Sequence, residues 1–373
     1  LSSDSQDLEE VVVVGYGTQK KTLVTGAISK LKASAMEDIP NSQISQVLQG
    51  RVSGVSVSTN SGQPGSASTV RVRGVTTFNT YGGNNPLWVV DGVVVDGGGI
   101  GFVNQSDIES VEVLKDAASL AIYGARAASG VIMITTKKGK AGKITVNYNG
   151  FSGFSGPAKK VELLNATQYG AIMHEKAGAA GQNLPFPSLA NLGAGTDWQS
   201  EIFNQNAFRY SQELSISGGN EVSTFFSSFS IQNQEGIVTT NISDYNKISL
   251  RLNSTHKISK IFSVGENLGW TQQKSKGLGN TNSEYGGPLS SALNLDPTTP
   301  LVITDPTVTN APPYSNNPVI RDANGNPYGI STLVGQEMTN PIAYTQTRLG
   351  NYGFSDDFVG NAYLEITPIE NLV

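Results

Sequence analysis

The spacing of hydrophobic positions changes near residue 140 and divides the chain into two regions. Before that point the apolar runs are short. Val111 and Val113 alternate with polar residues as in a half-buried strand, and residues 131–134 form a continuous apolar run typical of a buried strand. Between them, Asp116 is positioned to cap a short Ala-rich helix that Gly124 ends. This succession predicts a compact unit of strand, helix and strand.

Further short elements are predicted upstream, a helix and three extended segments, over residues 44–48, 52–57, 70–74 and 86–97. Asn41 is positioned to cap the helix. Asp91-Gly92 stands in the middle of the last segment and predicts a β-hairpin with a type I′ turn, which needs positive backbone φ angles. We therefore expect a mixed α/β unit over residues 35–140.

Beyond residue 140 the alternation becomes regular. Ile144, Val146 and Tyr148 alternate with polar residues, which predicts a strand with one apolar and one polar face. The same pattern returns in five later segments, over residues 208–217, 225–231, 248–253, 262–270 and 358–366. Glu266 interrupts the apolar face of its segment, so we expect it either near a membrane boundary or at a β-bulge.

The connections between these strands alternate between long and short. In chain order they span residues 156–207, 218–221, 234–243, 256–260 and 272–351. Tight turns on the periplasmic side and long loops outside are typical of a bacterial outer-membrane barrel. The smallest such barrels have about 8 strands and plugged transporters about 22, so six strands predict only the N-terminal part of a larger barrel. The predicted fold class is an α+β plug inside a transmembrane antiparallel β-barrel.

Residues 9–17 contain a run of valines between two glutamates and a glycine, which favours an extended strand. Such a strand near a terminus could pair with another protein by strand addition. It could equally pair within its own domain, and composition alone favours this second interpretation.

Composition excludes several classes of protein. The formal net charge of -5 shows no basic footprint, so nucleic acid is not an expected partner. No apolar run approaches the roughly 20 residues that a spanning helix needs, which excludes a helical membrane protein but not a barrel. The absence of cysteine removes thiolate chemistry and disulfides. The first residues lack an export signal, which we expect to have been removed or to lie outside this chain.

Enzyme motifs are not found. The two histidines, His174 and His256, fall in a predicted loop and turn, where a surface role is favoured over catalysis or metal binding. Residues 322–326 resemble a calcium loop but lack its final acidic residue, so a polar turn is expected. Asp356 and Asp357 are adjacent and point to opposite faces of a strand. We therefore predict no enzyme, no cofactor and no metal.

The residues of the first region resemble SusC/RagA-type TonB-dependent transporters of Bacteroidota outer membranes. The resemblance rests on the motifs at residues 10–18, 47–57, 70–74 (Val-Arg-Val-Arg-Gly), 86–92 (Pro-Leu-Trp-Val-Val-Asp-Gly), 107–116, 123–126 and 130–139, and on 361–368 in the barrel region. The small domain that usually precedes the valine run and most of the barrel are not in this chain. The resemblance implies an N-terminal extended segment with a TonB-box region over 1–34, a plug over 35–140 and barrel strands over 141–373.

By resemblance, TonB grips the valine run from the periplasm, and a SusD-like surface lipoprotein caps the barrel outside. The implied TonB-interacting residues are Glu9, Glu10, Val11, Val12, Val13, Val14, Gly15 and Tyr16. The implied function is active import of a glycan or a peptide, with a passive porin or a surface adhesin as the alternative.

Candidates for cargo contacts are Arg71 and Arg73, which are equally typical of a charged sheet edge, and the loop residues Tyr285 and Tyr314. The tyrosines could stack on sugar rings or belong to the aromatic girdle of the membrane.

Overall fold

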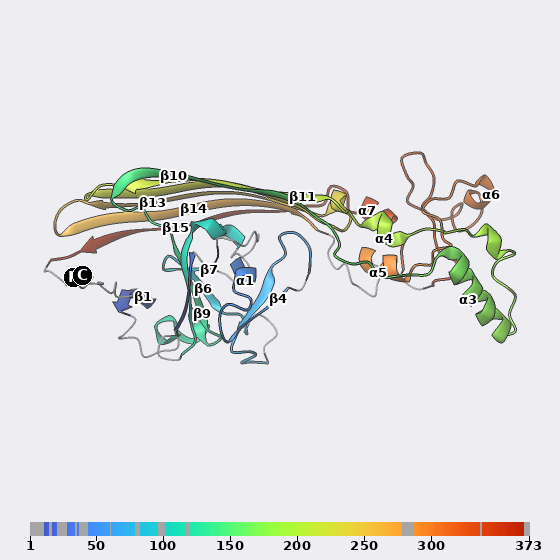
Figure 1. Ribbon diagram of the computed structural model, residues 1–373, viewed down its shortest axis with the longest axis horizontal. Helices are drawn as coiled ribbons and strands as arrows, with labels where there is room; N and C mark the ends of the chain where they lie inside the picture. Colours follow the sequence, from blue (N-terminus) through green and yellow to red (C-terminus); the bar gives the residue numbers. More distant parts are fainter. Residues whose placement is uncertain are drawn as a thin grey trace, which may run out of the picture.

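The computed structural model describes residues 11–14, 17–20, 28–33, 36, 44–59, 61–78, 83–95, 101–116, 120–277, 287–335 and 338–368. Within these residues the strands form a six-stranded sheet, a five-stranded sheet and two two-stranded sheets. The six-stranded sheet is one long curved layer, and the five-stranded sheet lies against its concave side (Figure 1). In the part of the chain that is described, no helix is long and apolar enough to cross a lipid bilayer.

The five-stranded sheet is the centre of the unit that we call the plug, residues 28–140. Its strands, in spatial order, are β3 (Ile28–Lys32), β8 (Ile108–Leu114), β9 (Val131–Thr136), β6 (Leu87–Val90) and β7 (Val93–Val95). Only the β6–β9 pair is parallel. The sheet therefore has two edge strands, β3 and β7, that come from distant parts of the chain.

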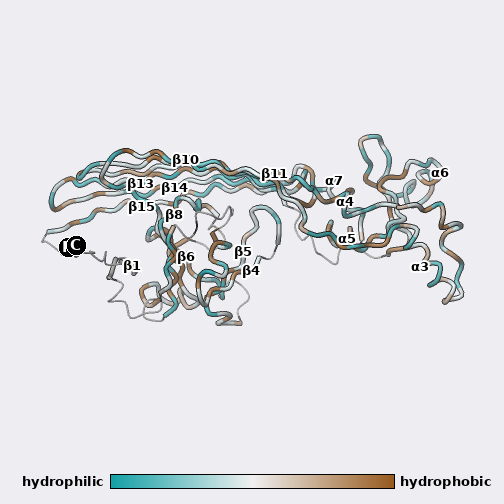
Figure 2. The backbone as a smooth tube through the Cα atoms, viewed as in Figure 1, coloured by the Kyte–Doolittle hydropathy of each residue, from teal (hydrophilic) through white to brown (hydrophobic). Residues whose placement is uncertain are grey.

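Both faces of the plug sheet are covered. The larger core packs Val111, Val113 and Trp88 of the sheet against α1 (Ile44–Val47) and the hairpin of β4 (Val55–Thr59) and β5 (Ser68–Val72). A smaller core on the opposite face joins Leu114, Val131 and Met133 to the 3₁₀ segment η5 (Ala121–Ala127). Figure 2 shows hydrophobic positions gathered in the plug strands around β6 and β8. Burial on both faces explains why residues 131–134 are continuously apolar.

The predicted strands and the hairpin of the plug are present, whereas the Ala-rich helix predicted to end at Gly124 is a 3₁₀ segment that continues to Ala127. Asp91 and Gly92 have φ angles of 47° and 85°, as a type I′ turn requires. Gly124 does interrupt the helical segment, with φ 65° and ψ −157°, but the chain turns again after it because Ala127 packs into the smaller core. The cap expected at Asn41 lies outside the described residues.

The six-stranded sheet, here called the wall, is antiparallel and follows chain order without a crossover. Its strands are β10 (Gly142–Ser155), β11 (Ala207–Gly219), β12 (Ser223–Glu235), β13 (Asp244–Lys257), β14 (Phe262–Lys276) and β15 (Gly353–Ile366). The short connections lie at one end of the wall and the long ones at the other (Figure 1). The alternation of connection lengths expected from the sequence is therefore confirmed.

Register places the two kinds of side chain on opposite faces of the wall. One continuous row runs across all six strands on the outer face, away from the plug, and consists of Tyr148, Leu214, Phe229, Leu250, Trp270 and Phe358. Tyr148 and Phe358 remain 68% and 70% exposed. Large apolar side chains at such exposure are stable only against lipid or another apolar partner. The inner face carries mostly Ser, Thr, Asn and Gln.

Glu266 lies on this outer face, and the bulge considered for it is not observed, because β14 keeps its register with both neighbouring strands. The hydroxyl of Ser254, its register partner on β13, donates a hydrogen bond to the Glu266 carboxylate. One neighbouring hydroxyl thus satisfies the carboxylate without a change in the strand.

The two longest connections fold together into a unit that we call the loop module, residues 156–206 and 287–352. It contains α3 (Ala166–Ala179), η6 (Leu189–Asn191), α4 (Trp198–Ile202), α5 (Pro288–Asn294), α6 (Pro306–Thr309) and α7 (Pro341–Gln346). Trp198 and Ala292 are buried together, and the Trp198 indole donates to the carbonyl of Asp296 at 3.0 Å. These long loops are therefore ordered by a core of their own at the far end of the wall (Figure 1).

Candidate functional site

The valine run forms a small hairpin that is separate from the plug sheet. β1 (Val11–Val14) pairs with β2 (Gly17–Lys20) in a two-stranded sheet, with Val12 opposite Gln19. The run therefore pairs locally, with a strand that lies outside the plug sheet, and its pairing with another protein stays a prediction. Glu9, Glu10, Gly15 and Tyr16 lie outside the described residues.

The next strand after this hairpin is β3, at one edge of the plug sheet. It pairs only with β8, over five register positions from Ile28 opposite Leu114 to Lys32 opposite Ser110. The Lys30 ammonium and the Glu112 carboxylate lie 2.9 Å apart across this pair, and the Glu112 side chain is 1% exposed. A pull on the hairpin would therefore reach the plug first through the β3–β8 ladder.

The opposite side of the plug is bound to the wall through the β6–β7 turn. The Asp91 carboxylate forms a buried ion pair with Arg251 of β13 and accepts hydrogen bonds from the backbone N–H of Thr136 at 2.9 Å and its hydroxyl at 2.7 Å. The Asn361 amide of β15 donates to the Asp91 carbonyl at 2.8 Å. The carboxylate of Asp91 is thus bound by the wall and by the neighbouring plug strand, and its backbone carbonyl is bound by the wall.

Other wall side chains donate to carbonyl oxygens of the plug backbone. The Thr271 hydroxyl donates to Phe102 at 2.8 Å, the Lys247 ammonium to Val103 at 3.3 Å, and the Asn253 amide to Lys137 at 2.8 Å. All three donors lie on β13 or β14. These contacts use the plug backbone, so they hold its position whatever side chains the plug presents.

A second buried carboxyl, that of Asp107, lies in this interface. Burial raises the pKa of Asp107 above its usual range, although a hydrogen bond with Ser228 and the nearby Arg251 and Lys247 act in the opposite direction. Removing a carboxyl from water costs free energy unless its partners compensate fully. Movement of the plug away from the wall would expose Asp107 to water again. The cost of burying this carboxyl therefore weakens the contact between plug and wall and favours release of the plug.

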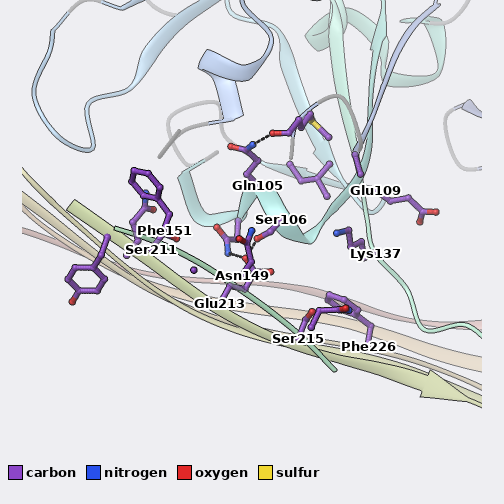
Figure 3. A pocket seen from close by; sticks show the side chains of 18 of the residues that line it. Gln105, Ser106, Glu109, Lys137, Asn149, Phe151, Ser211, Glu213, Ser215 and Phe226 are labelled. Carbon is purple, nitrogen blue, oxygen red and sulfur yellow. Dashed lines mark hydrogen bonds between the residues drawn. The ribbon is translucent and has the colours of Figure 1, made fainter. Parts of the chain in front are cut away.

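A cavity of about 1560 Å³ separates the plug from the inner face of β10, β11 and β12. Figure 3 shows Glu213 of β11 meeting Ser106 of the plug at its middle, with Phe151 of β10 further along the wall. Glu213 also accepts from the Asn104 amide at 3.1 Å. On this side the contacts of the wall with the plug come from Glu213 of β11 and Ser228 of β12, whereas β13, β14 and β15 supply most of the others.

The Asp91–Arg251 pair provides a test of how the plug is held. Their side chains are 5% and 8% exposed, and removing one partner of a buried pair typically costs about 3–5 kcal/mol. We expect Arg251→Leu in the intact receptor to lower the urea concentration at which protease gains access to the plug. The matched control is Lys276→Leu, which removes the half-exposed Lys276–Asp244 pair of the same wall and should cost about 0–1 kcal/mol. Equal effects of the two substitutions would contradict this assignment.

The residues that the sequence suggested for contact with cargo do not lie together in the structure. Arg73 is exposed and its guanidinium lies 3.4 Å from Asp116, while Arg71 is half-buried on β5, and neither lines the large cavity. Tyr314 is 5% exposed inside the loop module, where its hydroxyl accepts from the backbone N–H of Ile330 at 2.8 Å, so its ring is not presented to a ligand or to lipid. Tyr285 lies outside the described residues.

The remaining polar candidates behave as surface groups. His174 of α3 contacts the Phe186 carbonyl, and His256 at the end of β13 contacts two serines. The Asp322 carboxylate accepts from the backbone N–H groups of Asn324 and Asn326, which makes the expected polar turn. Within the described residues, no group of three or more His, Cys, Asp or Glu side chains is arranged to hold a metal ion.

Comparison with known proteins identifies the family. Residues 20–131 match the TonB-dependent Receptor Plug Domain. The chain is 34% identical to the TonB-dependent receptor SusC of Bacteroides thetaiotaomicron over 97% of its length, and 33% identical to the TonB-dependent receptor P26 of Formosa agariphila over 98%. The chain belongs to the SusC/RagA-type TonB-dependent receptors. It covers 35% and 34% of these two relatives, about a third of their length.

The solved structure of the RagAB peptide importer in its open-open state matches the same fold. It superposes with a TM-score of 0.76 at 26% identity, over 97% of this chain and 41% of that one. The expected fold class of the receptor, a mixed α/β plug followed by the first antiparallel strands of an outer-membrane barrel, is therefore confirmed. The family also agrees with the expectation of a receptor rather than an enzyme.

The sequence missed the residues that hold the plug. Arg251 and Asn253 fall on the polar face of the strand predicted over residues 248–253, and Lys247 directly precedes it on the same face of β13. The sequence did contain a signal, namely two cations and an amide close together on the face expected to line the lumen. Buried charges cost free energy unless they have a partner, so such a cluster indicates contact with the plug.

Proposed function

We propose that this receptor imports an oligosaccharide or a peptide across the outer membrane by TonB-driven remodelling of its plug, together with a SusD-like surface lipoprotein. The observation that carries the proposal is the arrangement of attachments around the plug. A separate hairpin leads to the edge strand β3, and the opposite edge and the loops beside it are bound to β13, β14 and β15. Force applied at one side is thus resisted at the other, which is the condition for deforming the sheet between them.

The β3–β8 ladder would carry this force along its length. The chain enters β3 at Ile28, opposite Leu114, whereas the wall contacts of Asp107 lie beyond the other end of β8. A pull on Ile28 directed along β3 would load the hydrogen bonds of the ladder together rather than one at a time. Each such bond contributes about 1 kcal/mol net, so the ladder resists small forces and yields cooperatively to larger ones.

TonB would bind by adding a strand to β1. In a two-stranded sheet the far edge of β1 has no partner strand, and such an edge offers backbone N–H and C=O groups to an incoming chain. Residues Glu9 to Tyr16 remain the proposed TonB-interacting segment. Strand addition depends mainly on backbone groups, which fits a segment of four successive valines.

The loop module is the proposed docking region for the surface lipoprotein. It stands at the end of the wall where the long connections lie, and it exposes Val161, Leu163 and Ile172 at 54%, 49% and 52%. Covering these side chains by a partner would remove apolar surface from water. The relative RagAB is described as a peptide importer, which supports a peptide as one of the two cargo classes.

A passive porin or an adhesin is the alternative function. Neither needs a hairpin outside the plug or a plug bound to the wall by a buried ion pair. The deciding experiment measures uptake of labelled oligosaccharides and peptides by cells that contain the receptor and its partner, with and without TonB. We expect uptake of one cargo class to disappear without TonB while surface levels of the receptor stay unchanged. Uptake that persists without TonB would favour the porin.

A further inference from the structure

One buried N–H group beside the cavity, the Nε of Arg209, has no hydrogen-bond partner among the described residues. Arg209 lies on the inner face of β11, between Gly153 of β10 and Gln234 of β12. Its Nε is buried and has no hydrogen-bond partner, and no ion pair joins the side chain to any residue that the structure describes. A buried guanidinium N–H without an acceptor is costly, so this group is suited to receive one from a ligand.

An aromatic ring fixes the position of this guanidinium. Its central carbon lies 4.9 Å from the centre of the Phe151 ring, within the range of a cation–π contact. Phe151 points from β10 toward the plug, into the cavity (Figure 3). Stacking restrains the guanidinium while leaving its N–H groups directed in the plane, which is the geometry used to bind carboxylates.

The cavity surface around Arg209 is polar, and the neighbouring acid Glu235 of β12 accepts from the backbone N–H of Phe208 at 2.7 Å. Gln232 and Gln234 of β12 line the same end of the cavity, and Ser61 and Gln63 line it from the plug. The acid that lines the cavity on the same strand, Glu213, is four residues away and is already bound to Ser106 and Asn104. The end of the cavity near Arg209 is therefore rich in hydrogen-bonding groups and locally positive.

The charge of the whole cavity lining has the same sign. It contains five cations, Arg209, Lys137, Lys138, Lys140 and Lys143, against two carboxylates, Glu109 and Glu213. The cations span its length, because Arg209 is near the loop-module end of β11 and Lys143 is near the start of β10 at the short-turn end. Such a lining lowers the electrostatic cost of moving an anion along the wall.

The cavity lies between the plug and β10, β11 and β12. Most hydrogen bonds from the wall to the plug come from β13, β14 and β15, whereas β11 and β12 contact it more locally, through Glu213 and Ser228. A plug deformed from its β3 edge while still held at β13–β15 would widen the space along β10–β12. This is the side on which Arg209 and Phe151 lie.

We infer that Arg209, stacked on Phe151, forms a carboxylate-binding subsite at the loop-module end of this cavity, and that the receptor selects cargo that bears carboxylates. The inference rests on the proposed import function and names its cargo by chemistry. A planar guanidinium binds a carboxylate through paired N–H donors, and the contact adds both affinity and orientation. The carboxylate can belong to an acidic peptide or to a uronic acid of a glycan.

The test uses the purified intact receptor with its partner lipoprotein and two pairs of probes. One pair is a short glutamate-rich peptide and its glutamine analogue, and the other is a galacturonate oligosaccharide and its methyl ester. We expect the wild type to bind the charged member of one pair, and Arg209→Gln to weaken that binding about tenfold, as loss of one charge-assisted hydrogen bond predicts. Arg209→Lys should keep part of the binding, because lysine retains the positive charge but lacks the paired N–H donors of the planar guanidinium.

The matched control is Lys274→Gln. Lys274 of β14 also lies over an aromatic ring, with its ammonium 4.6 Å from the centre of Tyr352, but it is exposed, outside the cavity and outside the loop module. This control should leave all binding unchanged. Equal losses for charged and neutral probes, or no loss at all, would overturn the inference for Arg209. TonB-dependent uptake confined to neutral cargo would also overturn it while leaving the import function intact, whereas uptake independent of TonB would remove the function itself.

Discussion

Deletion of Val11–Val14 is expected to abolish TonB-dependent uptake while the receptor still assembles in the outer membrane. The segment forms one strand of a hairpin that is separate from the plug sheet, so its removal takes nothing from the core of the plug or from the wall. It does remove the edge proposed for strand addition by TonB. Transport assays in cells, together with surface labelling of the receptor, measure the two quantities separately.

The control for this deletion removes the same length of chain from the other strand of the hairpin, Gly17–Lys20. It shortens the tether between the hairpin and β3 equally but leaves the valines. We expect this variant to keep a substantial part of the uptake. If both deletions abolish uptake, tether length rather than the valine strand is what matters, and the assignment of the TonB-interacting segment fails.

A disulfide between β3 and β8 is expected to stop transport reversibly. Lys32 and Ser110 are register partners at the last position of the ladder, and such antiparallel partners lie within the Cα separation that a disulfide spans. In a Lys32→Cys and Ser110→Cys variant, oxidation should fix β3 to the plug, so that pulling on the hairpin no longer separates the two strands. We expect uptake to fall to background in the oxidised receptor and to recover after reduction.

These 373 residues contain no cysteine, so the plug and the six wall strands offer no competing thiol. Each single-cysteine variant serves as a control for the effect of substitution alone. Undiminished uptake by the oxidised double variant would show that β3 does not leave β8 during transport. In that case force would have to move the plug as a rigid body, and the contacts of Asp91 with the wall would be the ones that break.

Local pattern predicted more of the wall than of the functional contacts. Strict alternation placed Tyr148, Leu250 and Phe358 on one apolar face, because the side-chain period of a strand is two whatever its neighbours are. The alternation of short and long connections likewise predicted that all short turns lie at one end of the wall, because successive antiparallel strands reverse direction. Tyr314 shows the limit of this reasoning, because a tyrosine in a long polar loop carries no sign that the loop folds around it.

By itself, the sequence determined the two regions, the alternating strands with their two faces, and the Asp91-Gly92 turn, since each depends on residues close together in the chain. Tertiary structure alone decided that Arg251 meets Asp91, 160 positions away, and that a cavity lies between the plug and β10, β11 and β12. Such pairings depend on the register of strands and on the docking of two units, which sum many weak long-range contacts. The local sequence pattern does not contain these long-range contacts. A charged residue on the polar face of a strand therefore indicates that it needs a partner, but not which residue that partner is.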